Sequence, residues 1–168
     1  MQIRKANECD LKCIGELFKD AKDSLKKDHV DQWQKDAYPS VDHARNDLKH
    51  GNLYVVEKDG VVCATALIAC MHEPTYDVIE HGMWKTNGKY FVIHRMVVDS
   101  RFKGTGVSMY LVERAKEMAL RQDVHAIRID THPDNLRMQG FLKKCGFKKC
   151  GIIYLEDRDI RYGFELVF

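Results

Sequence analysis

One short loop, Arg101-Phe102-Lys103-Gly104-Thr105-Gly106, limits the folds that this chain can adopt. The segment before it, residues 90–98, is almost continuously apolar and rich in β-branched and aromatic residues, which is typical of a strand covered on both faces. After the loop, apolar residues return at helical spacing over residues 107–118. Glycines let a backbone approach a ligand closely, and the first turn of a helix carries N–H donors without internal partners. This order of strand, glycine loop and helix predicts a site for a phosphate-bearing cofactor.

Two well-known glycine-loop chemistries do not fit this loop. A P-loop requires Gly-x4-Gly-Lys-Ser/Thr, which the chain lacks. A dinucleotide-binding loop requires a third glycine where Met109 stands, and it opens the first βαβ unit of its domain. The pattern Arg/Gln-x-x-Gly-x-Gly/Ala, placed directly after a strand and opening a helix, is matched in full by Arg101-x-x-Gly104-x-Gly106.

Composition narrows the class of protein further. The formal net charge of +2 is too small to indicate a nucleic-acid or membrane partner, and we expect neither. No apolar stretch reaches the length of a membrane span, and the first residues lack the apolar core of a secretory signal, so a cytoplasmic location is expected. The six cysteines fall within predicted helices and strands without a metal-ligand spacing. We therefore expect reduced thiols and no metal site.

Hydrophobic periodicity and turn signals predict a single domain over residues 1–168, of α/β class with a mixed sheet and helices on both sides. Strand 125–131 follows a helical crossover and should lie parallel to strand 90–98. Residues 71–89 are expected to form a long connection, with a short helix around 77–80. The other predicted elements are a strand at 2–5, a helix capped by Asn7, a short helix opened by Ser40, a hairpin turning at Asp59-Gly60, a helix over 104–121, a helix over 136–145, and strands at 147–155 and 162–168.

Two motifs together resemble the GNAT superfamily of N-acetyltransferases. Residues 97–107 resemble its pyrophosphate-binding motif, and His132-Pro133-Asp134-Asn135 followed by residues 141–147 resembles its second motif. Both occur in the right order with matching predicted elements. The resemblance implies a GNAT-like three-layer fold, whose central, mostly antiparallel sheet is splayed at Tyr90–Val98 and carries helices on both faces.

The resemblance also implies acetyl-CoA (coenzyme A) as co-substrate and an acetyl transfer to a primary amine of a small molecule or peptide. Backbone N–H groups of six residues would cradle the pyrophosphate: Lys103, Gly104, Thr105, Gly106, Val107 and Ser108. Arg101 opens the same motif and counts among the cofactor-binding residues. Backbone groups of Met96, Val97 and Val98 would meet the pantetheine arm, as an added strand pairs with a sheet edge. Asn135 would reach the pantetheine or acyl end, or would simply cap the following helix.

The sequence identifies the catalytic residues less directly than the cofactor-binding residues. His94 and Arg95 interrupt an apolar strand and should point to opposite faces, and a buried arginine needs an ion-pair partner. His94 or Glu73 is the candidate general base, with a structural histidine and a solvated carboxylate as the alternatives.

The family often carries a tyrosine general acid in the second motif, and Leu142 stands at that position. The sequence leaves open Tyr110, Tyr154, Cys145 or a water as the acid. A non-catalytic CoA-binding sensor or scaffold domain of the same fold is therefore a second hypothesis. The acceptor amine and the oligomeric state stay open, with a homodimer as one option.

Overall fold

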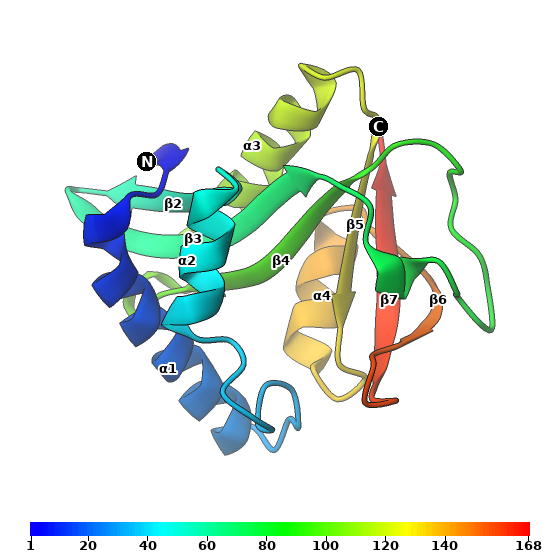
Figure 1. Cartoon of the computed structure of the whole chain (residues 1–168), viewed down its shortest axis with the longest axis horizontal. Coiled ribbons are helices and arrows are strands. Elements are labelled where there is room, and N and C mark those ends of the chain that lie inside the picture. The colour runs from blue at the N-terminus through cyan, green and yellow to red at the C-terminus, as the bar shows by residue number, and fades with distance from the viewer. The chain divides into compact units, whose positions relative to one another are not determined.

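The computed structural model describes residues 1–168, and its elements follow the predicted order (Figure 1). The strands are β1 (Gln2–Lys5), β2 (Leu53–Lys58), β3 (Val61–Cys70), β4 (Phe91–Val98), β5 (Ala126–Thr131), β6 (Lys148–Tyr154) and β7 (Ile160–Val167). The helices are α1 (Leu11–Lys27), α2 (Val41–Lys49), α3 (Val107–Leu120) and α4 (Leu136–Lys144), with 3-10 turns η1 (Glu8–Asp10), η2 (Pro74–Tyr76) and η3 (Ser100–Phe102).

The strands form one mixed sheet in the order β1-β2-β3-β4-β5-β7-β6. β4 pairs with β5 in parallel, as predicted, through Phe91 with Ile127 and Val92 with Arg128. The pairings β1–β2, β2–β3, β5–β7 and β6–β7 are antiparallel. The predicted α/β class with a mixed, mostly antiparallel sheet is confirmed.

The chain divides into two compact units. The first unit comprises Met1–Ile68 and His94–Arg114, and the second comprises Ala69–Ile93 and Ala115–Phe168, so β3, β4 and α3 contribute residues to both. The single domain expected over residues 1–168 and the splay of β4 stay predictions.

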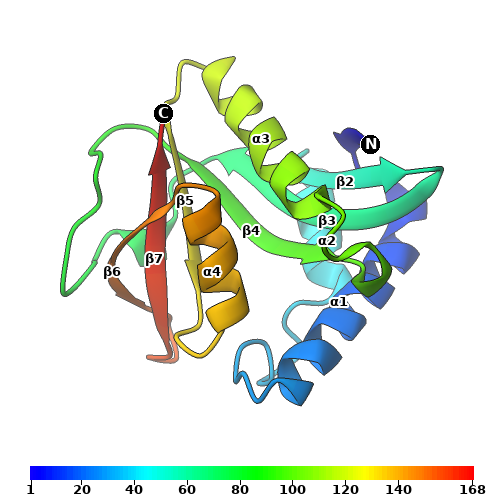
Figure 2. The same ribbon diagram turned by 180° about the vertical axis from the view of Figure 1, so that it is seen from behind.

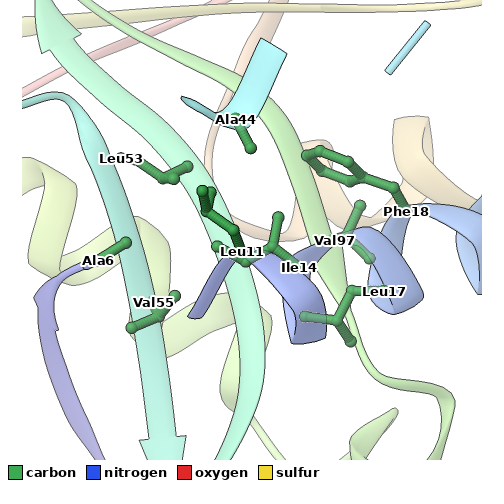
Figure 3. Packing of buried hydrophobic residues seen from close by; sticks show 9 residues of the cluster. All are labelled: Ala6, Leu11, Ile14, Leu17, Phe18, Ala44, Leu53, Val55 and Val97. Carbon is green, nitrogen blue, oxygen red and sulfur yellow. The ribbon is translucent and has the colours of Figure 1, made fainter. Parts of the chain in front are cut away.

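The first unit is built around the apolar face of α1. Leu11, Ile14 and Phe18 recur at helical spacing and point toward Leu53 of β2 and Val97 of β4 (Figure 3). The short helix α2 packs beside α1 on the same face of the strands, whereas the first turns of α3 lie on the opposite face (Figures 1 and 2). Helices thus cover both faces of this part of the sheet.

Local sequence signals explain where these elements begin and turn. The Asn7 side chain accepts from the Cys9 N–H (2.9 Å), and the Asp10 carboxylate accepts from the Asn7 N–H (2.8 Å), which completes a capping box. The hairpin between β2 and β3 turns at Asp59 and Gly60, whose φ values of 53° and 77° match a type I′ turn. Both features confirm the predictions made from the sequence.

The second unit packs two different layers onto β5, β7 and β6. The end of α4 meets one face, because a Cβ on Gly146 would stand 3.5 Å from Leu166 of β7. The long connection between β3 and β4 meets the other face, since a Cβ on Gly163 would stand 2.8 Å from the Trp84 ring. Positions 163 and 166 are an odd number of residues apart, so their side chains point to opposite faces of the strand.

The connection from Met71 to Tyr90 has almost no regular structure. Its only regular elements are the turn η2 and an isolated antiparallel bridge between Glu80 and Ile152, whose N–H and carbonyl groups exchange two bonds of 2.8 Å. The short helix expected around residues 77–80 is therefore wrong. Pairing with β6 satisfies the backbone of Glu80 better than an isolated helical turn would.

All six cysteines are free thiols in the structure. No group of three or more His, Cys, Asp or Glu side chains is arranged to hold a metal ion. None of the helices combines the length and the apolar character that crossing a membrane requires.

Candidate active site

The loop between β4 and α3 has the backbone that only glycine adopts readily. Gly104 and Gly106 have φ values of 78° and 85°, in the left-handed region. A Cβ built on either residue would meet no atom within 4 Å. The glycines are therefore required by backbone conformation and not by crowding, and the space in front of them is open to a ligand.

The N–H groups of this loop divide into two sets. Those of Lys103 and Thr105 donate to carbonyls of the preceding turn, each at 3.3 Å. The first helical bond of α3 runs from the Tyr110 N–H to the Gly106 carbonyl (2.9 Å), so Val107 and Ser108 precede it and have no intrahelical acceptor. An open glycine loop ending in such donors fits a pyrophosphate group.

Arg101 holds the start of the loop. Its backbone N–H and its guanidinium both donate to the Asp99 carboxylate, at 2.9 Å and at 2.6–3.1 Å. This side-chain hydrogen bond lowers the pKa of Asp99 despite its burial. The Asp99 N–H in turn donates to the Cys63 carbonyl of β3 (2.9 Å). In the structure, the Arg101 side chain therefore fixes the turn η3 that precedes the glycines.

β4 carries the remaining predicted residues of the first unit. Val97 is buried against α1, whereas Met96 and Val98 are half-buried. Arg95 makes the ion pair expected of it, because its guanidinium donates to both Asp47 oxygens at 2.9 and 2.7 Å. Arg95 also has a φ of 51°, which is unusual inside a strand.

His94 is half-buried beside this ion pair. Burial raises the pKa of Asp47, while the nearby Arg95 and His94 oppose that rise. Both roles predicted for His94, a base and a structural histidine, therefore stay open.

Glu73 lies in the second unit, at the start of η2. Its carboxylate Oε1 accepts from the Thr75 N–H (3.3 Å) and from the Thr75 hydroxyl (2.9 Å), so it caps that turn. Its own backbone N–H donates to the Tyr90 hydroxyl (3.1 Å). Glu73 is half-buried and held at two points, unlike the solvated loop carboxylate that the sequence also allowed.

Two residues of the second motif, Asn135 and Leu142, contribute to the fold of α4. The Asn135 carbonyl oxygen Oδ1 accepts from the Met138 N–H (3.0 Å), so Asn135 is the cap of α4, one of its two expected roles. Leu142 is fully buried with 0% exposure, as a core residue of the same helix.

Among the candidate acids, Tyr154 is exposed and donates to the Glu80 carboxylate (2.9 Å), which raises its pKa. Tyr110 stands in the first turn of α3, and the Arg114 guanidinium lies 5.2 Å from its ring centroid. Cys145 caps the other end of α4, where its N–H donates to the Phe141 carbonyl (3.0 Å).

Sequence reasoning missed the buried pair of Arg128 and Glu165. These residues face each other across β5 and β7, and the Arg128 Nε donates to the Glu165 Oε1 at 2.9 Å. Their side chains are 7% and 0% exposed. The available signal was a charge of opposite sign in each of two predicted strands, with Arg128 between Ile127 and Ile129 and Glu165 between Phe164 and Leu166.

Comparison with known proteins agrees with this geometry. Over residues 18–147 the chain matches the Acetyltransferase (GNAT) family. It is similar to the streptothricin acetyltransferase of Escherichia coli, with 37% identity over 60 residues, which are 36% of this chain and only 34% of that protein.

Two solved structures are similar over nearly the whole chain. A GNAT-family acetyltransferase from Streptococcus agalactiae superposes with a TM-score of 0.92 and 29% identity, covering 99% of this chain and 95% of the other. The ribosomal-protein-alanine N-acetyltransferase from Brucella melitensis, at 17% identity, shares the fold with a TM-score of 0.72 and complete coverage of both chains. With its glycine loop, its sheet order and a match over most of its length, the chain belongs to the GNAT acetyltransferase family.

Proposed function

We propose that this protein transfers an acetyl group from acetyl-CoA to a primary amine of a small molecule or peptide, and that residues 1–168 act as one N-acetyltransferase domain. The observation that carries the proposal is the open glycine loop at the start of α3. Gly104 and Gly106 adopt left-handed backbone, nothing fills the space before them, and Val107 and Ser108 offer first-turn donors. The partial similarity to streptothricin acetyltransferase supports a small-molecule acceptor.

In this proposal the loop residues, from Lys103 to Ser108, hold the pyrophosphate, and Arg101 keeps their turn in shape through Asp99. Backbone groups of Met96, Val97 and Val98 bind the pantetheine arm, and Asn135 contributes from the start of α4. Acetyl-CoA, when bound, supplies the thioester that acylates the acceptor.

The chain must also move two protons. A base takes one proton from the acceptor amine as its nitrogen bonds to the acyl carbon, and an acid gives one to the leaving thiolate as the carbon–sulfur bond breaks. Glu73 or His94 is the proposed base. Tyr110, Tyr154, Cys145 or a water supplies the acid, because the fully buried Leu142 has no proton to give.

The buried Leu142 also supports the second candidate, a CoA-binding sensor or scaffold that has lost its chemistry. Release of free thiol from acetyl-CoA distinguishes the two functions. The enzyme releases free thiol from acetyl-CoA when a suitable amine is present, whereas the sensor binds CoA and releases no thiol with any amine.

Mutation of the loop tests the CoA site itself. Gly106→Val places a branched side chain in the open space, and we expect CoA affinity to fall by about a hundredfold or more. Gly60→Val is the matched control, because Gly60 has a φ of 77° and also has no atom within 4 Å of a built Cβ.

Both substitutions should lower stability by a similar 1–2 kcal/mol, roughly the penalty of left-handed backbone. Calorimetric titration with CoA should therefore separate two variants that melt alike. Unchanged CoA affinity in Gly106→Val, or an equal loss in Gly60→Val, would contradict the proposed site.

A further inference from the structure

Two buried charges hold one end of the connection that carries Glu73. The Glu165 carboxylate accepts from the Lys85 N–H, from the Thr86 N–H (3.2 Å) and from the Thr86 hydroxyl (2.7 Å). Arg128 completes the cluster by donating to Glu165 (2.9 Å) and to the Thr86 carbonyl (2.6 Å). The backbone at residues 85–86 is thus fixed to β5 and β7 by charge-assisted hydrogen bonds.

Arg128 also determines where two aromatic rings lie. The centre of its guanidinium is 4.4 Å from the centroid of the Trp84 ring and 4.0 Å from that of the Tyr90 ring. A guanidinium at such distances from aromatic faces is attracted to them, most strongly when water is excluded. The Tyr90 ring is therefore placed by a buried side chain of β5 and not by the connection alone.

The two rings in turn fasten the other end of the connection. The Tyr90 hydroxyl accepts from the Glu73 N–H (3.1 Å), and the Trp84 indole N–H donates to the Tyr76 carbonyl (2.8 Å). The Tyr76 hydroxyl then donates to the Asp130 carboxylate of β5 (2.7 Å). The connection, whose only regular elements are η2 and the Glu80 bridge, is therefore held at both ends. Among the contacts of these two rings, the one that involves Glu73 is the hydrogen bond to Tyr90.

From these contacts we infer that Tyr90 is a positioning residue for Glu73, and that Arg128 acts through it by holding the Tyr90 ring. The inference rests on the proposed function, in the form where Glu73 is the general base. A base that is displaced by about 1 Å loses much of its rate advantage, although its chemistry is intact. The Tyr90 hydroxyl should therefore affect turnover more than the affinity for acetyl-CoA, because its hydrogen bond is to Glu73 and not to the glycine loop.

A mutant cycle tests this inference. Tyr90→Phe removes the hydroxyl and keeps the ring on Arg128, and Glu73→Gln removes the charge while keeping an oxygen that can cap η2. Tyr162→Phe is the control, since it makes the same chemical change on β7 of the same unit. Thiol release from acetyl-CoA is measured for these three variants and for the Tyr90→Phe/Glu73→Gln double variant, with an amine that the wild type acetylates.

We expect Glu73→Gln to lower kcat by about a hundredfold or more, as the loss of a general base does. Tyr90→Phe should lower kcat by about fivefold, as the loss of one hydrogen bond does, with KM for acetyl-CoA within about twofold of the wild type. In the double variant, Tyr90→Phe should add nothing to Glu73→Gln, because a positioning residue acts only through its partner. Tyr162→Phe should match the wild type.

Hydrogen exchange gives a readout that does not depend on activity. The Glu73 amide should exchange about tenfold faster in Tyr90→Phe and at the wild-type rate in Tyr162→Phe. The inference is overturned if Glu73→Gln is impaired while Tyr90→Phe turns over normally, or if the Tyr90→Phe loss is equally large in both backgrounds. Normal turnover by Glu73→Gln would instead remove Glu73 as base and the inference with it. No thiol release by the wild type with any amine would contradict the proposed function itself.

Discussion

The buried pair of Arg128 and Glu165 should be a principal determinant of the stability of the second unit. Glu165→Gln removes the charge that Arg128 faces at 2.9 Å, at a position where the glutamate side chain is 0% exposed. It also turns an amide N–H₂ toward the backbone N–H groups of Lys85 and Thr86. In the wild type these two groups donate hydrogen bonds to the Glu165 carboxylate. Breaking a buried pair by neutralising one partner costs about 3–5 kcal/mol, because the other charge stays buried without compensation.

For a chain of this length, about 1 kcal/mol shifts the melting temperature by roughly 2–4 °C. We therefore expect Glu165→Gln to melt about 6–20 °C below the wild type, with a matching loss in urea denaturation. The control is Glu57→Gln, which weakens the half-buried pair with Arg4 and should cost about 1 kcal/mol or less. A Glu165→Gln protein within about 1 kcal/mol of the wild type, or one no less stable than Glu57→Gln, would show that the buried pair contributes little to stability.

Two further predictions concern the core and the pH dependence of stability. Leu142→Ala empties a fully buried site in α4 and should lower the free energy of unfolding by about 2–5 kcal/mol in urea; a loss below about 1 kcal/mol would mean that the site is not packed as described. Arg4 donates to both oxygens of Asp10 (2.7 and 2.9 Å), which holds the pKa of Asp10 below its usual value. The stability that this carboxylate contributes is complete above the unfolded pKa of about 3.9 and is lost as the pH falls through the folded pKa. The difference in unfolding free energy between the wild type and Asp10→Asn should therefore be constant near neutrality and shrink below about pH 4, and a difference that grows on acidification would contradict the assignment.

The sequence predicts most of the fold because its local signals agree with its long-range pattern. Asn7 and Ser40 precede helices, Asp59-Gly60 turns a hairpin, and the crossover after Gly106 places β5 parallel to β4. In each case a capping side chain, a left-handed turn or a connection length determines the structure by itself.

The connection from Met71 to Tyr90 could not be predicted in the same way. Its conformation depends on Arg128 and Glu165, which are 38 or more residues farther along the chain, and on the glycine at 163 that leaves room for Trp84. No periodicity within the connection encodes those contacts. The same limit applies to Glu73, whose cap on η2 and bond to Tyr90 appear only once the connection is folded.

The glycine loop is the part of the site where sequence and structure agree in most detail. The motif from Arg101 to Gly106 predicted an anion cradle, and the structure provides its left-handed glycines and first-turn donors. The structure adds that the Arg101 side chain is engaged with Asp99. A short pattern can predict backbone geometry, but which partner a flexible side chain takes depends on its surroundings.

The proposed transfer of an acetyl group from acetyl-CoA to an amine can be measured on the wild-type protein. The most direct measurement is to incubate the wild-type protein with acetyl-CoA and a panel of small-molecule and peptide amines, following free thiol and the mass of each amine together. We expect at least one amine to gain one acetyl group in step with thiol release, and Gly106→Val to lose both signals. Tight binding of acetyl-CoA with neither thiol nor acetylated product for any amine in a broad panel would contradict the proposed transfer.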